Sequence, residues 1–213
     1  MNAIIFIVIH NLRKGFSMKR ILASVFLTVA LVAVAHAEPW TVDKVHSQVG
    51  FSVKHMMVSN VRGEFGSYEA TVDFDPANPA ALSIEATIEV KSISTRDTNR
   101  DKHLCSADFF DAANYPAMTF KSKKVAKIGD GHFQVSGELT IRGVTKEITL
   151  DVVGLNTVWD DPWGSRHAGA TASAVINRQD FGLMWNKALE AGGVVVGDEV
   201  TINLEIELMQ KKN

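Results

Sequence analysis

The sequence predicts an all-β protein built from antiparallel strands. Apolar and polar residues alternate in most segments after residue 40, which is typical of strands with one buried face. Short clusters of glycine, proline, asparagine and aspartate separate these segments, and connections that short join antiparallel neighbours. No stretch between them has the periodicity of a long helix. With 213 residues, of which 46% are hydrophobic, the chain is long enough to bury a core.

About eight such segments can be distinguished. The clearest covers residues 82–91, where leucine, isoleucine, alanine and valine alternate with serine, glutamate, threonine and lysine. In the segment 60–75 the apolar residues change phase close to Gly66, and we expect a bulge there because glycine is common at such irregularities. We expect hairpin turns at 128–131 and 142–143. After the short segment 40–44, the alternating segments are 48–55, 60–75, 82–91, 118–121, 133–141, 148–152, 168–176 and 200–208.

The alternation does not decide how the strands are arranged. One apolar face on each strand requires either a second sheet or closure of the sheet into a barrel. A sandwich and a barrel both satisfy the pattern.

One stretch, residues 99–116, interrupts the alternation with charged residues, histidine and aromatics. Asp97 or Thr98 can cap a short helix that runs through Lys102, because either side chain can accept hydrogen bonds from the free amides of a first turn. Asp108 precedes a second short turn, and Pro116 ends it by removing a backbone donor. We expect this polar insert to close one end of the β structure.

The first 37 residues have the organisation of a secretion signal. Met18-Lys19-Arg20 is a basic start, residues 21–34 form an apolar core, and Ala35-His36-Ala37 is a cleavage site of small residues. We therefore expect translation to start at Met18 rather than Met1, and cleavage to leave a single domain, 38–213. The alternative is an uncleaved membrane anchor, which the basic residues between the two apolar runs argue against.

The charge distribution restricts the partners of the mature domain. Four of the 22 basic residues precede residue 38 and none of the 24 acidic residues does, so the remainder is acidic. A nucleic-acid partner would need clustered lysine and arginine, and we expect none.

Several motifs occur in a specific order along the chain. Around the insert they are Ser94-Thr95, Arg100-Asp101, His103-Leu104, Ser106, Asp108-Phe109-Phe110-Asp111 and Tyr115-Pro116. Before it they are Asp43, His46-Ser47, Phe51, Val53-Lys54-His55, Gly63 and Phe65-Gly66. After it they are Gly137, Leu139-Thr140, Gly143-Val144-Thr145, Asn177-Arg178 and Asp180-Phe181-Gly182. In these motifs the chain resembles, from about Pro39 to Leu208, the YceI-like family of lipid- and polyisoprenoid-binding periplasmic proteins.

The resemblance implies a closed antiparallel barrel of about eight strands, lipocalin-like, with the insert as a short helical segment at one end. It also implies a periplasmic carrier that holds a long polyisoprenoid or isoprenoid quinone inside the barrel, with no other cofactor. Transient contact with a membrane surface fits such a role, and both a monomer and a homodimer stay open.

The interior of this barrel could be hollow or filled. The alanines of the segment 168–176 place only methyl groups where other strands present leucine or isoleucine, and Gly137 and Ala86 are also small and inward. A packed core must meet such residues with large ones, and Phe51, Phe120, Phe133 and Trp185 could do so. The resemblance favours a ligand cavity. The residues expected to line it are Val49, Phe51, Val53, Phe74, Ile84, Ala86, Ile88, Phe120, Phe133, Val135, Leu139, Ala168, Ala170, Ala172, Ala174, Ile202 and Leu204.

Four basic or titratable residues could meet the polar head of a ligand: His55, Arg100, His103 and Arg178. Guanidinium pairs well with phosphate. The alternative is local pairing, of Arg100 with Asp101 or Asp108 and of Arg178 with Asp180, and we favour it.

Residues for catalysis are not evident. The histidines of the mature chain show no close ligand spacing, so we predict no metal site, although one assembled across strands stays open. Cys105, the single cysteine, has no disulfide partner, and His103 lies on a different helix face, so we interpret Cys105 as a small apolar residue. We predict no enzyme. The alternatives are a ligand-free structural or stress-response barrel, and an enzyme acting on an isoprenoid lipid with His103 or His55 as base.

Overall fold

The computed structural model describes residues 39–190 and 192–211. The expected secretion signal therefore lies outside the described residues. Among the described residues, no helix combines the length and the apolar character needed to cross a membrane.

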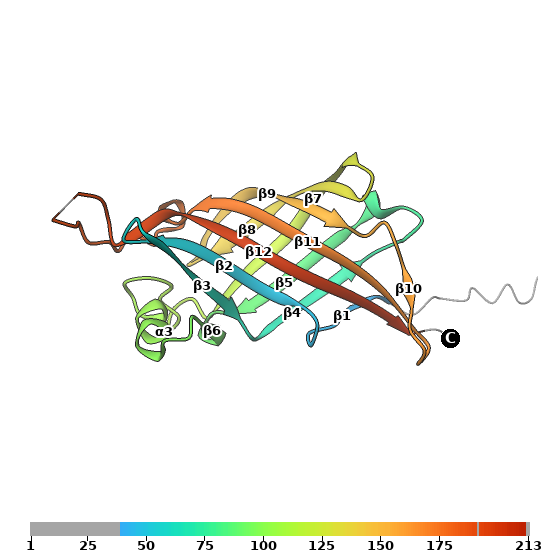
Figure 1. The fold of residues 1–213 in the computed structure, drawn as a ribbon, viewed down its shortest axis with the longest axis horizontal. Helices are drawn as coiled ribbons and strands as arrows, with labels where there is room; N and C mark the ends of the chain where they lie inside the picture. Colours follow the sequence, from blue (N-terminus) through green and yellow to red (C-terminus); the bar gives the residue numbers. More distant parts are fainter. Residues whose placement is uncertain (1–38, 191, 212–213) are drawn as a thin grey trace, which may run out of the picture. The chain divides into compact units, whose positions relative to one another are not determined.

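A single antiparallel sheet makes up most of the described chain, and it curls round on itself (Figure 1). Buried apolar side chains form its core. Its strands follow in the order β4-β5-β7-β8-β9-β11-β12-β2-β3-β6, with β1 paired to β12 and β10 paired to β11. The all-β, lipocalin-like barrel with a short helix is thus confirmed. The strands are β1 (Thr41–Val42), β2 (Gln48–His55), β3 (Ser59–Phe65), β4 (Tyr68–Asp73), β5 (Ser83–Glu89), β6 (Ile93–Ser94), β7 (Ala117–Gly129), β8 (His132–Ile141), β9 (Val144–Gly154), β10 (Trp159–Asp160), β11 (Ser165–Asn177) and β12 (Val196–Lys211).

Within the described residues, the sheet has twelve strands rather than the eight expected, because two long strands are interrupted and the two-residue strands β1 and β10 are added. The segment 60–75 divides into β3 and β4 at Gly66 and Ser67, both exposed, where a one-residue bulge was predicted. Two residues rather than one separate the inward-facing Phe65 from the inward-facing Tyr68, which restores the phase. A 3-10 turn, η2 (Val90–Ser92), similarly separates β5 from β6.

This interruption is also where the barrel closes. β3 and β4 are consecutive in the chain but lie near opposite ends of the strand order. Backbone hydrogen bonds continue across the break: Gly66 N donates to Ser92 O at 3.2 Å, and Glu89 N donates to Ser67 O at 2.9 Å. The strand that bends at Gly66 therefore joins both edges of the sheet.

The two predicted hairpin turns are confirmed. Asp130 and Gly131 connect β7 to β8, and Arg142 and Gly143 connect β8 to β9. Arg142 and Gly143 both have positive φ, 50° and 75°, as a two-residue turn of the I′ type requires. The glycine at the second position lowers the cost of that conformation.

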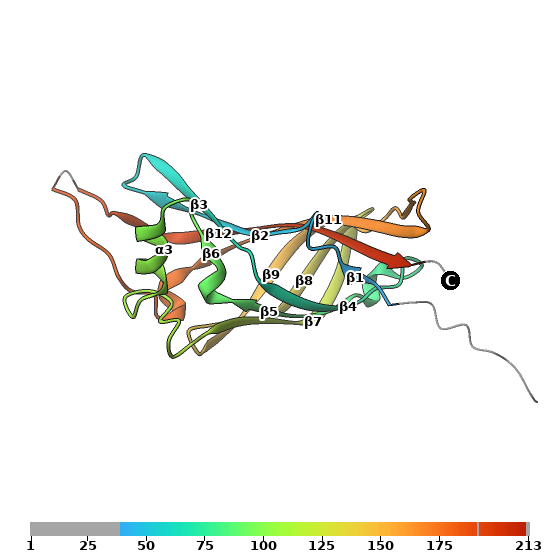
Figure 2. The same ribbon diagram turned by 90° about the horizontal axis from the view of Figure 1, so that it is seen from below.

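The insert forms the helix α3 (Thr98–Cys105), which lies at one end of the sheet (Figure 2). Asp97 is its N-cap, and its side chain accepts hydrogen bonds from Asn99 N at 3.0 Å and Arg100 N at 2.9 Å. The helix ends three residues later than the expected Lys102.

The register of β11 places the alanines inward, as the alternation predicted. Ala168, Ala170, Ala172 and Ala174 alternate with the exposed Gly169, Thr171 and Ser173. Each alanine pairs across to a large aliphatic residue on β12, and these partners are Leu208, Ile206, Leu204 and Ile202 in turn. Small residues on one strand thus face the same interior as large residues on its neighbour.

Candidate functional site

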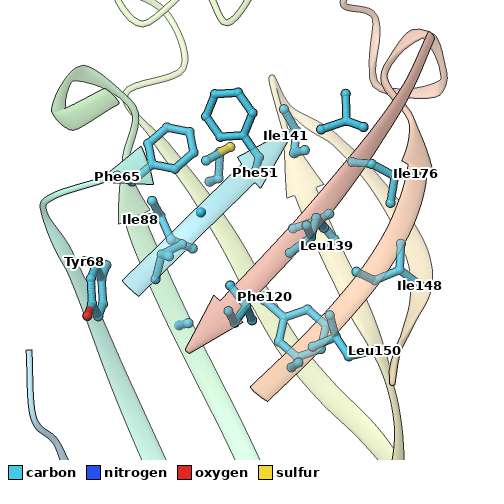
Figure 3. A pocket seen from close by; sticks show the side chains of 18 of the residues that line it. Phe51, Phe65, Tyr68, Ile88, Phe120, Leu139, Ile141, Ile148, Leu150 and Ile176 are labelled. Atoms are coloured by element: carbon cyan, nitrogen blue, oxygen red, sulfur yellow. The ribbon is translucent and has the colours of Figure 1, made fainter. Parts of the chain in front are cut away.

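An apolar cavity of about 270 Å³ lies between the inner faces of the strands (Figure 3). Twelve of the residues expected to line a ligand cavity lie in its wall. They are Val49, Phe51, Val53, Ile84, Ala86, Ile88, Phe120, Leu139, Ala170, Ala172, Ile202 and Leu204.

Five further residues expected in the wall are absent from it. Phe74, Phe133, Val135 and Ala168 are buried in the apolar core, and Ala174 packs against that core. Phe74 lies edge-on to Trp40, with ring centroids 5.2 Å apart. Alternation predicts which way a side chain points, but it does not predict whether neighbouring side chains cover it.

Other residues of the wall were not expected from the sequence. Leu104, Phe109 and Phe110 come from α3 and the turn after it, and Phe181 and Leu183 come from the segment before β12. Phe110 contacts Phe65 edge-on, with ring centroids 6.0 Å apart. The aromatic pair in the Asp108–Asp111 motif was the available signal, since two phenylalanines in a polar insert need an apolar surface to cover.

Among the described residues, the cavity wall contains two side chains with nitrogen or oxygen atoms, those of Tyr68 and Arg178. The Tyr68 hydroxyl donates to Ser47 O at 3.3 Å, and burial raises the pKa of this phenol. The rest of the wall is aliphatic, aromatic or thioether. Such a wall binds hydrocarbon and offers little to a charged group.

The Arg178 guanidinium makes all its hydrogen bonds within the protein. The residue is 4% exposed and begins the 3-10 turn η3 (Arg178–Phe181). Its Nε donates to Gly197 O at 2.9 Å, and one terminal nitrogen donates to Trp185 O at 2.9 Å and to Leu183 O. The other donates to Asp198 Oδ1 at 3.1 Å and to Val196 O at 3.4 Å.

These contacts give Arg178 a structural role. All its N–H groups have acceptors within the protein, which leaves none for a ligand head group. Its carboxylate partner is Asp198 and not the expected Asp180, because η3 directs the guanidinium toward the start of β12. Arg178 therefore pairs within the protein, as the local-pairing alternative predicted, but with Asp198 instead of Asp180.

The other residues expected near a head group lie outside the cavity wall. Arg100 donates through Nε to Thr95 Oγ1 and through a terminal nitrogen to Thr95 O, each at 2.7 Å, and pairs with neither expected aspartate. His103 Nε2 lies 2.9 Å from Asp108 Oδ2. The His55 backbone pairs with Ser59 at the end of the β2–β3 hairpin.

Cys105 is partly buried at the end of α3, where its Sγ lies 4.0 Å from Val90 O. Burial and, secondarily, the charge of Asp101 raise the pKa of this thiol. A raised pKa reduces the thiolate fraction, which is the nucleophilic form. The environment therefore suits a small packed residue.

The fold and its apolar cavity agree with the sequence comparison. Residues 40–208 match the YceI-like domain. The chain belongs to the YceI-like family. Among its relatives, a UPF0312 protein of Staphylococcus aureus (strain N315) is 38% identical over 169 residues, which cover 79% of this chain and 95% of that protein. A UPF0312 protein of Vibrio cholerae is 34% identical over 170 residues, covering 78% and 89%.

Several solved structures share the fold. The YceI protein of Campylobacter jejuni is 38% identical with a TM-score of 0.64, covering 81% of this chain and 98% of that one. BcnA of Burkholderia cenocepacia is 30% identical with a TM-score of 0.66, covering 78% and 98%. A polyisoprenoid-binding domain of Saccharophagus degradans is 16% identical with a TM-score of 0.58, covering 83% and 100%, and this likeness concerns the fold alone.

Proposed function

We propose that this YceI-like protein is a periplasmic lipid-binding protein that sequesters or transports a long-chain polyisoprenoid or isoprenoid quinone. The observation that carries the proposal is the cavity wall, in which the one charged side chain is saturated by protein acceptors. A wall of this kind favours apolar ligands over polar ones. The fold shared with a polyisoprenoid-binding domain supports the choice of ligand class.

The physical basis is the exclusion of hydrocarbon from water. Each CH₂ group removed from water contributes about 0.8 kcal/mol, so a free isoprenoid chain in the periplasm is very costly. Transfer from a bilayer to an apolar cavity costs far less, because both environments are dry. A protein of this kind can therefore take up and release its ligand reversibly.

The polar head of the ligand lies, in this proposal, at the edge of the cavity rather than within it. Among the described residues, the interior supplies no free cation for a diphosphate, and its one hydroxyl, that of Tyr68, already donates to Ser47 O. The protein then discriminates weakly between head groups, and its selectivity depends mainly on the length and shape of the ligand's hydrocarbon chain.

Secretion through a cleaved signal that ends at Ala37 is part of the same proposal. Loading from a bilayer also requires contact with its surface, and the β2–β3 turn is suited to this. Met57 and Val58 are 56% and 81% exposed, and the Met56 backbone N–H donates to Val195 O beside the wall residue Val196. Met56 and Met57 hold positive φ, which is uncommon for such side chains.

Native mass spectrometry of protein purified from its own host tests the proposal. The expected result is a co-purifying apolar mass that is released by organic extraction and is absent from an Ala172→Trp variant, whose indole would occupy the cavity. An empty spectrum for the unmodified protein under gentle conditions would favour the ligand-free structural barrel instead. A bound lipid that is chemically changed on incubation would favour the enzyme alternative.

A further inference from the structure

Three potential metal ligands converge on the outer face of the sheet, where the loop after β1 meets β12. They are Asp43, His46 and Glu207, and their ligand atoms all lie within 4.8 Å of one another. His46 Nδ1 and Asp43 Oδ2 are 2.9 Å apart. Glu207 lies between Ile206 and Leu208, which face the cavity, so its own side chain points away from it. The group is therefore separate from the lipid cavity.

The backbone fixes this arrangement. Asp43 N donates to Glu207 O at 2.8 Å, and Glu207 N donates to Ser47 Oγ at 2.9 Å. Val45 N donates to Asp43 Oδ1 at 2.9 Å, which leaves Asp43 Oδ2 directed at His46. The loop is thus fastened to β12 on both sides of His46. A site that is held in place by the fold does not have to be ordered by the ion.

A second histidine orients one of the carboxylates. His167, on β11, places Nδ1 2.7 Å from Glu207 Oε1 and Nε2 3.0 Å from Asp161 Oδ2. Asp161 Oδ1 in turn accepts hydrogen bonds from Trp163 N and Ser165 N, each at 2.8 Å. Metal-binding carboxylates are commonly held by hydrogen bonds of this kind, which set the orientation of the ligand oxygen.

The group differs from the isolated histidine–aspartate pairs in the described part of the chain. His103 with Asp108 and His132 with Asp151 are pairs, at 2.9 Å and 2.7 Å, and neither belongs to a larger group of ligands. The His46 side chain is 62% exposed, whereas that of Asp43 is 16% exposed. An ion can therefore reach the group from solvent, with the histidine at its entrance.

We propose that Asp43, His46 and Glu207 bind a divalent transition-metal ion of the Zn²⁺ type. One imidazole nitrogen and two carboxylate oxygens are ligands that Zn²⁺ accepts, whereas Mg²⁺ and Ca²⁺ prefer oxygen alone. The ion replaces the contact between His46 Nδ1 and Asp43 Oδ2, and water completes its coordination. His167 acts as a positioning residue through Glu207. This inference does not depend on the proposed lipid function.

Calorimetric titration of the EDTA-treated, dialysed protein with ZnSO₄ tests the site. We expect saturable binding of one ion, weakened at least tenfold by His46→Gln and by Glu207→Gln. His132→Gln is the matched control, because it removes an exposed histidine–aspartate pair without a third ligand, and it should leave the affinity unchanged. Thermal melts of each variant show whether the fold is retained.

The positioning role of His167 needs its own readout. His167→Gln should weaken Zn²⁺ binding by about 10- to 100-fold. It should also change the visible absorption of bound Co²⁺, which reports ligand geometry, whereas His132→Gln should not. The site is overturned by the absence of Zn²⁺ binding, or by unchanged affinity in the folded His46→Gln and Glu207→Gln variants. An unchanged Co²⁺ spectrum in His167→Gln would overturn the positioning role alone.

Discussion

The ring of Phe120 on β7 lies against the backbone of Gly137 on β8, inside the barrel. A Cβ atom at position 137 would lie 2.6 Å from Phe120 Cζ and 2.5 Å from the Lys121 carbonyl oxygen. Phe51 and Gly63 form a similar pair, in which a Cβ would lie 2.5 Å from the ring. Aromatic rings thus cover the glycines of neighbouring strands at two places in the wall.

Gly137→Ala should therefore destabilise the protein, although alanine normally stabilises a strand relative to glycine. The added methyl group meets the Lys121 backbone, which cannot move aside cheaply, so we expect a loss of about 1–3 kcal/mol. Urea unfolding measures it. Gly169→Ala is the control, because its Cβ would meet no atom closer than 3.9 Å, and it should be neutral or stabilising. Equal stability of the two variants would contradict the close contact.

Arg178→Met should destabilise the protein strongly. The change removes a donor from the carbonyl oxygens of Leu183, Trp185 and Gly197, and each unsatisfied buried group costs about 1–3 kcal/mol. Val196 O and Asp198 Oδ1 keep a second donor each, from Asn186 Nδ2 and Gln179 Nε2 at 2.8 Å. Partial solvation keeps the total below the full sum, and we expect about 3 kcal/mol or more. Arg178→Lys should recover only part, since an ammonium has three donors. Arg62→Met, on the exposed face of β3, should be nearly neutral by the same unfolding measurement.

Cys105 should react slowly and be dispensable. Because burial raises its thiol pKa, alkylation by iodoacetamide at pH 8 should be much slower in the folded protein than in urea. Cys105→Ser should retain the fold and the bound lipid. Rapid alkylation of folded protein, or loss of lipid from a folded Cys105→Ser variant, would contradict this interpretation.

The sequence predicted well which way side chains point, and it predicted poorly which residues they contact. Period-two alternation placed the alanines of β11 inward, because register follows directly from which face is apolar. It left open whether Gly137 leaves space or is covered by a large residue such as Phe120, and the ring of Phe120 does cover it. Which residues face each other across two strands depends on the register between those strands, and the sequence of one strand does not determine that register.

Long-range pairings were invisible for the same reason. The Asp180 beside Arg178 in the sequence is not its partner, and Glu207 joins Asp43 and His46 across more than 160 residues. Sequence spacing reveals metal ligands on one helix or hairpin. It cannot reveal ligands that a barrel brings together when its first strand pairs with its last.

The exposed β2–β3 turn should contribute to membrane contact. Met57→Ser with Val58→Ser should reduce co-flotation of the protein with vesicles of phosphatidylethanolamine and phosphatidylglycerol, because less apolar surface then enters the interface. Trp163→Ser with Val175→Ser is the control, since both residues are highly exposed but lie outside this turn. Equal losses in the two double variants would exclude a specific role for the turn.

The interior of the barrel offers the sharpest distinction between a carrier and a packed structural barrel. Ala170 and Ala172 line the cavity, so Ala170→Phe and Ala172→Trp should fill it rather than clash. In a packed core, added bulk typically costs about 1–3 kcal/mol through strain. In a cavity the same bulk gains apolar contact, so lipid-stripped protein should melt at an unchanged or slightly higher temperature while lipid uptake is lost. Gly169→Phe and Thr171→Phe, on the exposed face of β11, should leave uptake intact. Strong destabilisation by the inward pair, with the outward pair tolerated, would contradict an open interior, because the two cases change stability in opposite directions.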